Sequence, residues 1–280
     1  MTNNAVEIKD LLIKYANFTL SVDELALEEG YVYGLVGKNG AGKTTLLKSI
    51  VNLVRHVNDK ITIFGKDLTI NDIELKNIIG YVNDEFIYPG NMTGKQLANN
   101  VGCFYTHFDA FYFYDLLKRF NIDRDTKFKN LSKGSKHKLM IAFALSYKPR
   151  LLLLDEPTAD IDPVARREIL QLLFEIMDEG NLTVIFSTHI TSDLEYIADY
   201  IILIDQGHIL FNNRKDHLEE QFQVVQMEQL DDAIKPYLRG IEKIEGGYQA
   251  LCIRANEFKD NAAYQFKRAS IEDIMVYLEK

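Results

Sequence analysis

A glycine-rich stretch near the N-terminus carries the residue types best suited to bind phosphate. Residues 37–45 read GKNGAGKTT and fit the phosphate-loop pattern, in which glycines let backbone N–H groups curl around phosphate oxygens at a helix N-terminus. We expect Lys43 to act as a catalytic residue on the β and γ phosphates, and Thr44 to place its hydroxyl on magnesium. The other nucleotide contacts expected in this loop are Asn39, Gly40, Gly42 and Thr45.

Two adjacent carboxylates follow an apolar run further along the chain. Residues 151–154 are all leucine, and Asp155 and Glu156 come directly after them. Asp155 suits a magnesium ion held through a bound water, and Glu156 suits the general base that orients an attacking water. Paired acids at a strand end could instead only cap the next helix. The phosphate loop favours the catalytic interpretation, because the two patterns together are typical of an NTPase.

Short apolar runs predict the sheet that must position these residues. They are near-continuous rather than alternating, which indicates a parallel sheet covered on both faces. The predicted strands are 31–36, 78–82, 151–154, 183–186 and 201–204. Helix-like segments at 44–54, 163–178 and 191–198 lie between them. This alternation predicts an α/β fold, and a strand before and a helix after residues 37–45 count against a chance glycine turn.

Two further segments differ in character from this alternation. Residues 86–148 lack strand-like runs and predict a helical insertion within a first domain of residues 1–211. Residues 212–280 predict a small C-terminal appendage with a strand at 248–254 and a final helix. Ser270 and Asp273 form a plausible capping box for that helix.

Composition narrows the classes of partner. The 280 residues are 47% hydrophobic and 26% charged, which matches ordinary globular proteins. The net charge of -9 opposes a nucleic acid as the main partner. No apolar run approaches the roughly 20 residues of a membrane-spanning helix, and the start has no secretory signal, so we expect a cytoplasmic chain.

A third motif separates this chain from other phosphate-loop NTPases. Residues 131–135 read LSKGS and precede a helix-like run, and here the chain resembles the ABC ATPase family over residues 6–211. In that family this segment, usually LSGGQ, binds the γ-phosphate of a nucleotide held by the opposite subunit. Ser132 and Gly134 match the pattern, whereas Lys133 and Ser135 depart from it.

Other residues occupy positions to which the family resemblance gives roles. Tyr15 resembles the aromatic that stacks on adenine, although an ordinary sheet aromatic is a rival interpretation. Asp162 resembles an aspartate that communicates across the dimer, with Asp160 in place of the usual glycine. His189 resembles the switch histidine that contacts the γ-phosphate. Asp84 stands where the family usually has glutamine, and this departure bears on how hydrolysis is coupled to the membrane partner. An aspartate can still contact magnesium, so Asp84 is a candidate magnesium ligand.

The resemblance implies an ABC ATPase fold with a mixed or parallel sheet core, a helical subdomain and the appendage. It implies a subunit that binds ATP and Mg²⁺ and hydrolyses ATP to drive transport through an integral-membrane subunit on a separate chain. A second ATP-binding subunit, identical or paralogous, would complete the dimer at the inner face of the cell membrane. The motif LSKGS, the position of Asp84 and the ending 270–278 resemble Gram-positive exporters of peptides, toxins or drugs.

Two alternatives remain at this point. One is a soluble ABC ATPase that acts on ribosomes or DNA, although such proteins usually carry two motor domains or a long coiled coil. The other is a regulatory module with weak hydrolysis. Such a module should lack Glu156 or His189, and this chain has both.

Seven aromatics between 104 and 114 lie in the helical insertion, which in this family docks the membrane partner. They cannot all face inward on helices of 3.6 periodicity.

Overall fold

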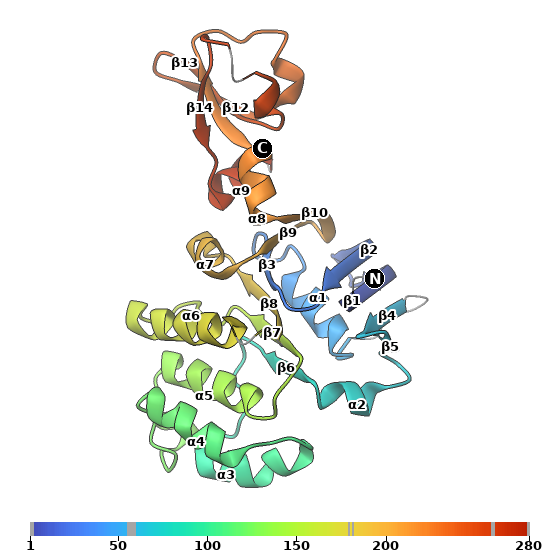
Figure 1. The fold of residues 1–280 in the computed structure, drawn as a ribbon, viewed down its shortest axis with the longest axis vertical. Coiled ribbons are helices and arrows are strands. Elements are labelled where there is room, and N and C mark those ends of the chain that lie inside the picture. The colour runs from blue at the N-terminus through green and yellow to red at the C-terminus, as the bar shows by residue number, and fades with distance from the viewer. Residues whose placement is uncertain (1–2, 55–59, 179, 181, 259–260, 279–280) are drawn as a thin grey trace.

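One sheet of ten strands organises most of the chain in a computed structural model, which describes residues 3–54, 60–178, 180, 182–258 and 261–278 (Figure 1). Its strands are β1 (Asn4–Lys14), β2 (Thr19–Glu28), β3 (Val32–Val36), β4 (Lys60–Ile63), β5 (Lys66–Asp67), β6 (Ile79–Val82), β7 (Leu151–Asp155), β8 (Thr183–Thr188), β9 (Tyr200–Asp205) and β10 (His208–Arg214). They lie in the order β5-β4-β1-β2-β10-β9-β3-β8-β7-β6. The ends of the two expected segments, residues 1 and 280, lie outside the described residues.

The half of the sheet from β9 to β6 is parallel. Every residue of β3, β7 and β8 is buried, as expected for strands covered on both faces. The five strands predicted from apolar runs are these five, with bounds that agree within two residues at either end. The prediction of a parallel core is therefore confirmed.

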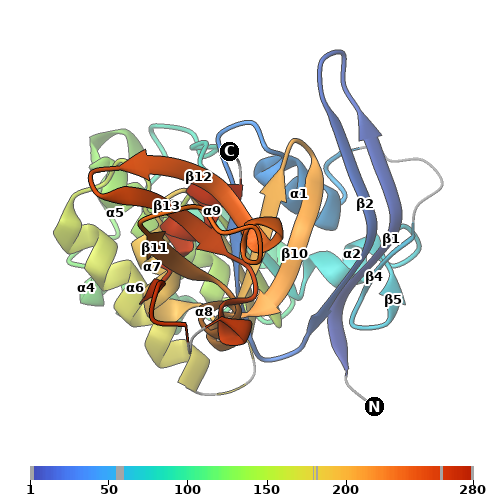
Figure 2. The ribbon, with the colours of Figure 1, turned by 90° about the horizontal axis from the view of Figure 1, so that it is seen from above.

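The other half of the sheet is mostly antiparallel, although β10 pairs with β2 in parallel, so the sheet is mixed. The resemblance allowed a mixed sheet, but the strands of this half were not among those predicted from apolar runs. β1 pairs with β2 and with β4, and β10 pairs with β9, all antiparallel. In β2, buried and more exposed positions largely alternate, because one face of an antiparallel sheet can meet solvent. Continuous apolar runs are the wrong signal for such strands. Figure 2 shows the β1–β2 hairpin projecting beyond the rest of the sheet.

Helices cover the sheet and fill the segment between β6 and β7. They are α1 (Lys43–Ile50), α2 (Asp72–Lys76), α3 (Gly94–Asn100), α4 (Ala110–Arg119), α5 (Lys133–Leu145), α6 (Pro163–Asp178) and α7 (Thr191–Ile197). The helix expected at 44–54 ends at Ile50. Its end is fixed by Asn52, which has a left-handed φ of 56°, and by the N–H of Leu53, which donates to the carbonyl of Lys48 at 2.9 Å.

The aromatic residues of the helical segment divide between core and surface. Phe113 is fully buried and packs against Phe143, with ring centroids 5.8 Å apart. Phe104 and Phe111 are exposed, and Tyr112 is on the border of exposure. The expectation that these aromatics cannot all face inward is confirmed.

The C-terminal segment folds into a second, smaller sheet. Its elements are α8 (Lys215–Gln221), β11 (Gln223–Met227), β12 (Leu238–Ile244), β13 (Gly247–Cys252), β14 (Gln265–Arg268) and α9 (Ile271–Leu278). The four strands are antiparallel, in the order β12-β13-β11-β14. Only β13 and α9 were predicted. Ser270 caps α9 as expected, because its hydroxyl accepts from the N–H of Asp273 at 3.0 Å while the Asp273 carboxylate accepts from the N–H of Ser270 at 2.9 Å.

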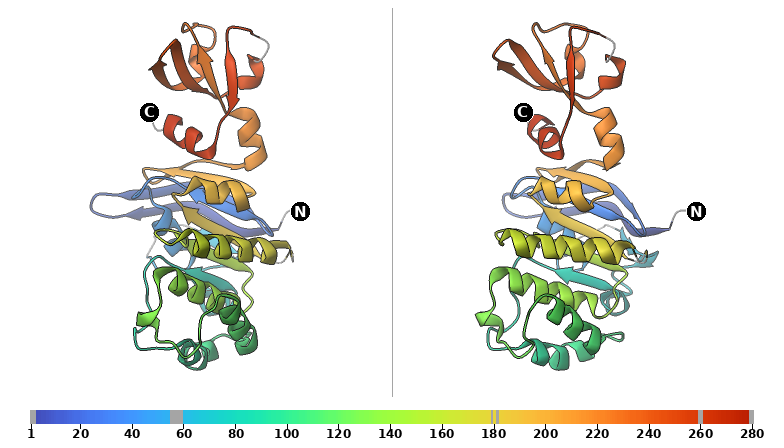
Figure 3. Two further views of the ribbon diagram at one scale, coloured as in Figure 1. Left: turned by 90° about the vertical axis from the view of Figure 1, so that its left-hand side faces the viewer. Right: turned by 60° about the vertical axis from the view of Figure 1, so that its left-hand side comes forward.

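The appendage packs directly on the main domain. Figure 3 shows it above the large sheet, with the helices between β6 and β7 at the opposite end of the molecule. Leu218 of α8 and Ile274 of α9 belong to the same buried apolar cluster as Leu194 and Ile197 of α7. The appendage is therefore anchored through the helix that follows His189.

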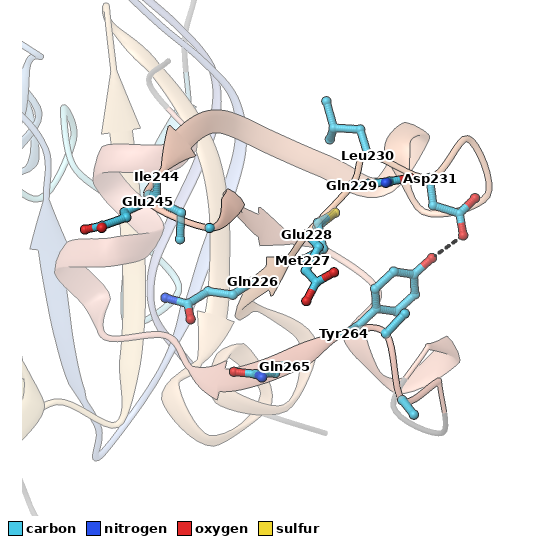
Figure 4. Close-up of a pocket in the computed structure, with 13 residues that line it drawn as sticks. Gln226, Met227, Glu228, Gln229, Leu230, Asp231, Ile244, Glu245, Tyr264 and Gln265 are labelled. Carbon is cyan, nitrogen blue, oxygen red and sulfur yellow. Dashed lines mark hydrogen bonds between the residues drawn. The ribbon is translucent and has the colours of Figure 1, made fainter.

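A separate hollow of about 710 Å³ opens within the appendage (Figure 4). Glu228, Asp231 and Glu245 are among its lining residues, and Tyr264 donates its hydroxyl to the Asp231 carboxylate at 2.6 Å. None of its described lining residues is a candidate site residue from the sequence.

In the part of the chain that the structure describes, no helix combines the length and the apolar character needed to cross a membrane.

We expect Ile274→Ala to lower the free energy of unfolding by about 2–5 kcal/mol, because Ile274 is only 3% exposed in the cluster that joins α9 to α7. Val276 lies on the same helix and is 42% exposed, so Val276→Ala should change the free energy of unfolding by no more than about 0.5 kcal/mol. Urea unfolding of both variants measures the difference. Equal small effects would mean that α9 is not packed as described.

Candidate nucleotide-binding site

The register of three neighbouring strands brings the predicted motifs to one edge of the sheet. Val36, the last residue of β3, lies opposite Thr188 at the end of β8. Asp155, the last residue of β7, lies opposite Ser187 of β8. The loops that follow these strands therefore start side by side, at the carboxyl edge where ligands bind in open α/β sheets.

The phosphate loop is held tightly between this edge and the β9–β10 turn. A Cβ on Gly37 would lie 2.2 Å from the carbonyl oxygen of Ile204, so the loop can run here only with glycine. Gly42 has a φ of 115°, which glycine adopts without strain, and it directly precedes α1. The N–H of Gly207 donates to the carbonyl of Ala41 at 2.9 Å and fixes the loop against the turn.

The side chain of Lys43 folds back into this loop. It is 6% exposed, and its ammonium group donates to the carbonyl oxygens of Gly37 at 2.7 Å and Lys38 at 3.3 Å. The same Nζ lies 3.4 Å from Oε1 of Glu156. The positive charge of Lys43 is therefore held at the centre of the loop. Thr44 and Thr45, the next two residues, are partly exposed in the first turn of α1.

Glu156 connects Lys43 to His189. Its second oxygen, Oε2, lies 2.8 Å from Nδ1 of His189. The backbone of Glu156 is strained, with a φ of 50°, and its N–H donates to the carbonyl of Ser187 at 3.1 Å. Strained backbone of this kind persists only where surrounding structure holds it, and it is concentrated at functional sites. The geometry thus brings together a cation, a carboxylate and an imidazole from three different loops.

Asp155 presents a buried carboxylate with one oxygen unused. Oδ1 accepts from the Ser187 hydroxyl at 2.6 Å, whereas the buried Oδ2 has no hydrogen-bond partner among the described residues. Burial raises the pKa of Asp155, hydrogen bonds from Ser187 and Thr44 oppose the rise, and the nearby charges of Asp84 and Glu156 add to it. A cation beside Oδ2 would remove the desolvation cost of this charge.

These oxygens fit a magnesium ion in kind and number. Mg²⁺ prefers oxygen ligands and usually takes only one or two from the protein when it is bound with substrate phosphates. Asp155 and the hydroxyl of Thr44 supply such oxygens, and Asp84 lies exposed on the loop after β6. Within the described residues, no group of three or more His, Cys, Asp or Glu side chains could hold a metal.

Tyr15 lies beyond the end of β1, in the turn that leads to β2. It is half exposed, and its ring stacks on Phe18 with centroids 6.4 Å apart. The Phe18 ring in turn approaches Gly42, since a Cβ there would lie 2.9 Å from it. Tyr15 is therefore not a sheet aromatic. Asn39 and Gly40 are exposed at the tip of the phosphate loop.

The LSKGS residues form a second group, at the N-terminus of α5. The Ser132 hydroxyl accepts from the N–H of Ser135 at 3.1 Å and caps the helix. A Cβ on Gly134 would lie 2.8 Å from that of Ala165, so glycine allows the start of α5 to approach α6 closely. Lys133 forms an ion pair with Asp160 at 3.0 Å. These contacts place Gly134 against the first turn of α6 and Lys133 against the segment that precedes it.

Asp162 belongs to this second group. Its Oδ1 accepts from the N–H groups of Ala165 at 2.9 Å and Val164 at 3.1 Å, so it caps α6. The hydrogen bond from Ala165 is the main cause that lowers the pKa of Asp162. Two residues that we did not single out also shape the first group, namely Ser187 and Phe18. Ser187 was recognisable as a polar residue that ends an apolar strand, whereas nothing local marks Phe18.

The fold and these loops define a phosphate-loop nucleotide-binding domain. The ABC transporter family model matches residues 20–159. The chain is 32% identical to the bacitracin transport ATP-binding protein BcrA of Bacillus licheniformis over 206 residues, 72% of this chain and 67% of that protein. It is 30% identical to the lantibiotic transport ATP-binding protein SrtF of Streptococcus pyogenes over 236 residues, 78% of this chain and 95% of that protein.

Solved structures agree on the fold. An ATP-binding subunit of an ABC transporter superposes with a TM-score of 0.69 at 24% identity, covering 78% of this chain and 92% of that one. The cbiO1 protein of Clostridium perfringens gives 0.65 at 24% identity, covering 77% and 90%. The chain therefore belongs to the ABC transporter family, as one of its ATP-binding and ATP-hydrolysing subunits.

We expect Asp155→Asn to raise the melting temperature measured without nucleotide or magnesium, because it removes a buried charge with an unpartnered oxygen. The melting temperature should rise by about 2–4 °C for each kcal/mol that the substitution adds to the free energy of unfolding. The pKa of Asp155 is raised, so this cost is present at neutral pH and fades as the pH falls through that pKa towards the ordinary value of 3.8.

The matched control is Asp216→Asn, which removes an exposed carboxylate on α8 and should leave the melting temperature almost unchanged. Calorimetry at neutral pH and at about pH 4 compares the two variants with the parent chain. A lower melting temperature for Asp155→Asn at neutral pH would show that the ionised carboxylate stabilises the fold.

Proposed function

We propose that Lys43, Glu156 and His189 are the catalytic residues of ATP hydrolysis in this chain. The observation that carries this proposal is the position of the Glu156 carboxylate, 3.4 Å from Nζ of Lys43 and 2.8 Å from Nδ1 of His189. Glu156 accepts a proton from the attacking water as general base, and His189 orients the water and the γ-phosphate. Lys43 holds the β and γ phosphates and stabilises the charge that develops on them.

The remaining residues of the loop position the nucleotide. We propose that Tyr15 stacks on the adenine ring, since its exposed ring stacks on Phe18, which approaches Gly42 of the loop. Backbone N–H groups at the start of α1 point towards the phosphates, as at other helix N-termini. The proposed contacts within the loop are Asn39, Gly40, Gly42, Lys43, Thr44 and Thr45.

We propose that Mg²⁺ accompanies ATP, held by Thr44, Asp155 and Asp84. The buried, unpartnered oxygen of Asp155 supports this assignment. When bound there, the ion would supply positive charge that offsets the negative charge of the phosphates during hydrolysis. Ser187 keeps the Asp155 carboxylate oriented through the hydrogen bond at 2.6 Å. Asp84 supplies a carboxylate from an exposed loop, where it can meet the ion directly or through water.

A second ATP-binding subunit completes the site in this proposal. Ser132, Gly134 and Asp162 lie where α5 meets α6, and none of their described contacts is with Lys43. We infer that they face the nucleotide of a partner subunit, identical or paralogous, and that the N-terminus of α5 receives its γ-phosphate. Two nucleotides would then lie between two chains, and hydrolysis would open the dimer.

We propose that an integral-membrane subunit on a separate chain carries the cargo, which places this chain on the cytoplasmic side of the cell membrane. The relatives named for bacitracin and lantibiotic transport support export of peptides, toxins or drugs. A hollow of about 250 Å³ is lined, among others, by Leu53 near α1, Leu75 of α2, Met140 of α5 and Ile87, which follows β6. Ile87 and Leu53 are exposed at it, which supports docking of the membrane subunit there.

In this proposal residues 1–211 form the motor, with a helical subdomain at 86–148, and residues 212–280 form the appendage. A soluble ABC ATPase and a regulatory module with weak hydrolysis are the competing functions. Co-purification of a membrane protein with the tagged chain separates the transporter from both. No nucleic-acid partner is proposed, because the net charge is -9.

We expect Glu156→Gln to bind ATP with nearly unchanged affinity and to hydrolyse it about 10²- to 10⁴-fold more slowly, because the amide cannot accept the proton of the attacking water. Equilibrium binding of a fluorescent ATP analogue and phosphate release measure the two effects. The control is Glu175→Gln, which removes a surface ion pair with Arg119 and should leave turnover unchanged. Undiminished turnover in Glu156→Gln would refute the assignment of the base.

A further inference from the structure

Asp193 is a buried carboxylate in α7, four residues after His189. It is 1% exposed, and both of its oxygens are used. Oδ2 accepts from the hydroxyl of Thr158 at 2.6 Å, and Oδ1 accepts from Nε of Arg166 at 2.6 Å. A buried ionised carboxylate is tolerated only when it is paired and hydrogen-bonded in this way.

The two partners of Asp193 come from the other two segments of the site. Thr158 is itself 1% exposed and lies two residues after Glu156. Arg166 is in the first turn of α6, where its N–H donates to the carbonyl of Asp162 at 3.0 Å. One carboxylate thus joins the helix after His189 to the loop after Glu156 and to the start of α6.

A second contact supports the same junction. Nη2 of Arg166 donates to the hydroxyl of Ser192 at 2.7 Å, so the guanidinium binds two adjacent residues of α7, Ser192 and Asp193. Planar guanidinium groups hold such pairs in a defined geometry. The start of α7 therefore has little freedom to move relative to α6 while this pair is intact.

We infer that Asp193 is a positioning residue for ATP hydrolysis, which holds His189 in register with Glu156 through Thr158 and Arg166. This inference rests on the proposed roles of His189 and Glu156. A buried ion pair is weak evidence of stabilisation, because apolar replacements are often neutral, whereas its fixed geometry is well suited to orienting a neighbouring group. A misplacement of about 1 Å at such a site can cost about 10²-fold in rate.

The test compares Asp193→Asn, His189→Ala and the double variant with the parent chain. Asp193→Asn should lower kcat up to about 100-fold while the KM for ATP and the affinity for a fluorescent ATP analogue change little. If Asp193 acts through His189, its effect should largely disappear in the His189→Ala background. Glu195→Gln, an exposed acid on the same helix, should leave turnover unchanged.

A milder pair of variants covers the case in which Asp193→Asn fails to fold. Thr158→Val removes only the hydroxyl that donates to Asp193, and Thr158→Ser restores it. Turnover should fall in Thr158→Val and return in Thr158→Ser, with ATP affinity retained in both.

The outcomes separate the inference from the function on which it rests. If His189→Ala itself leaves turnover unchanged, the proposed role of His189 is wrong. If His189→Ala lowers turnover but Asp193→Asn and Thr158→Val do not, the positioning role is overturned alone. A full multiplicative effect of Asp193→Asn in the His189→Ala background would likewise overturn it, because a merely structural residue acts independently of His189.

Discussion

The parallel pairing of β8 with β3 on one side and β7 on the other determines where every other part of the site lies. This pairing sets Val36 opposite Thr188 and Asp155 opposite Ser187, so three loops begin at one edge. Parallel strands must be covered on both faces, which is why these three are apolar up to the point where chemistry begins. The change from buried aliphatic to polar side chains at the strand ends marks the boundary between scaffold and site.

At that edge the site concentrates features that cost stability and that the scaffold offsets. Asp155 is a buried carboxylate with an unpartnered oxygen, and Glu156 has a strained backbone. The ammonium group of Lys43 compensates one carboxylate, and Ser187 orients the other. Behind this layer, Asp193 joins α7 to α6. Since α7 also shares its apolar cluster with α9, the appendage packs on the same helix that follows His189.

The sequence predicted the parts of this arrangement that have local causes. Continuous apolar runs located the five parallel strands. The phosphate loop was recognisable because its backbone conformation and close packing require glycine at fixed positions. The antiparallel strands of the large sheet were missed because β1 and β2 alternate in burial. In the appendage, β13 and α9 were predicted, whereas β11, β12 and β14 were missed because they are short or only partly buried. The contacts of Asp193 were beyond prediction, since they join residues 27 and 35 positions apart in the chain.

The central claim is that this chain hydrolyses ATP at a site built around Lys43 and completed by a second ATP-binding subunit. The most direct measurement is ATP turnover by the purified chain and by Lys43→Ala over a wide range of protein concentrations. We predict that the activity of the parent chain rises more than linearly with concentration and that Lys43→Ala abolishes it. Activity that is strictly proportional to concentration, or that survives in Lys43→Ala, would contradict this account.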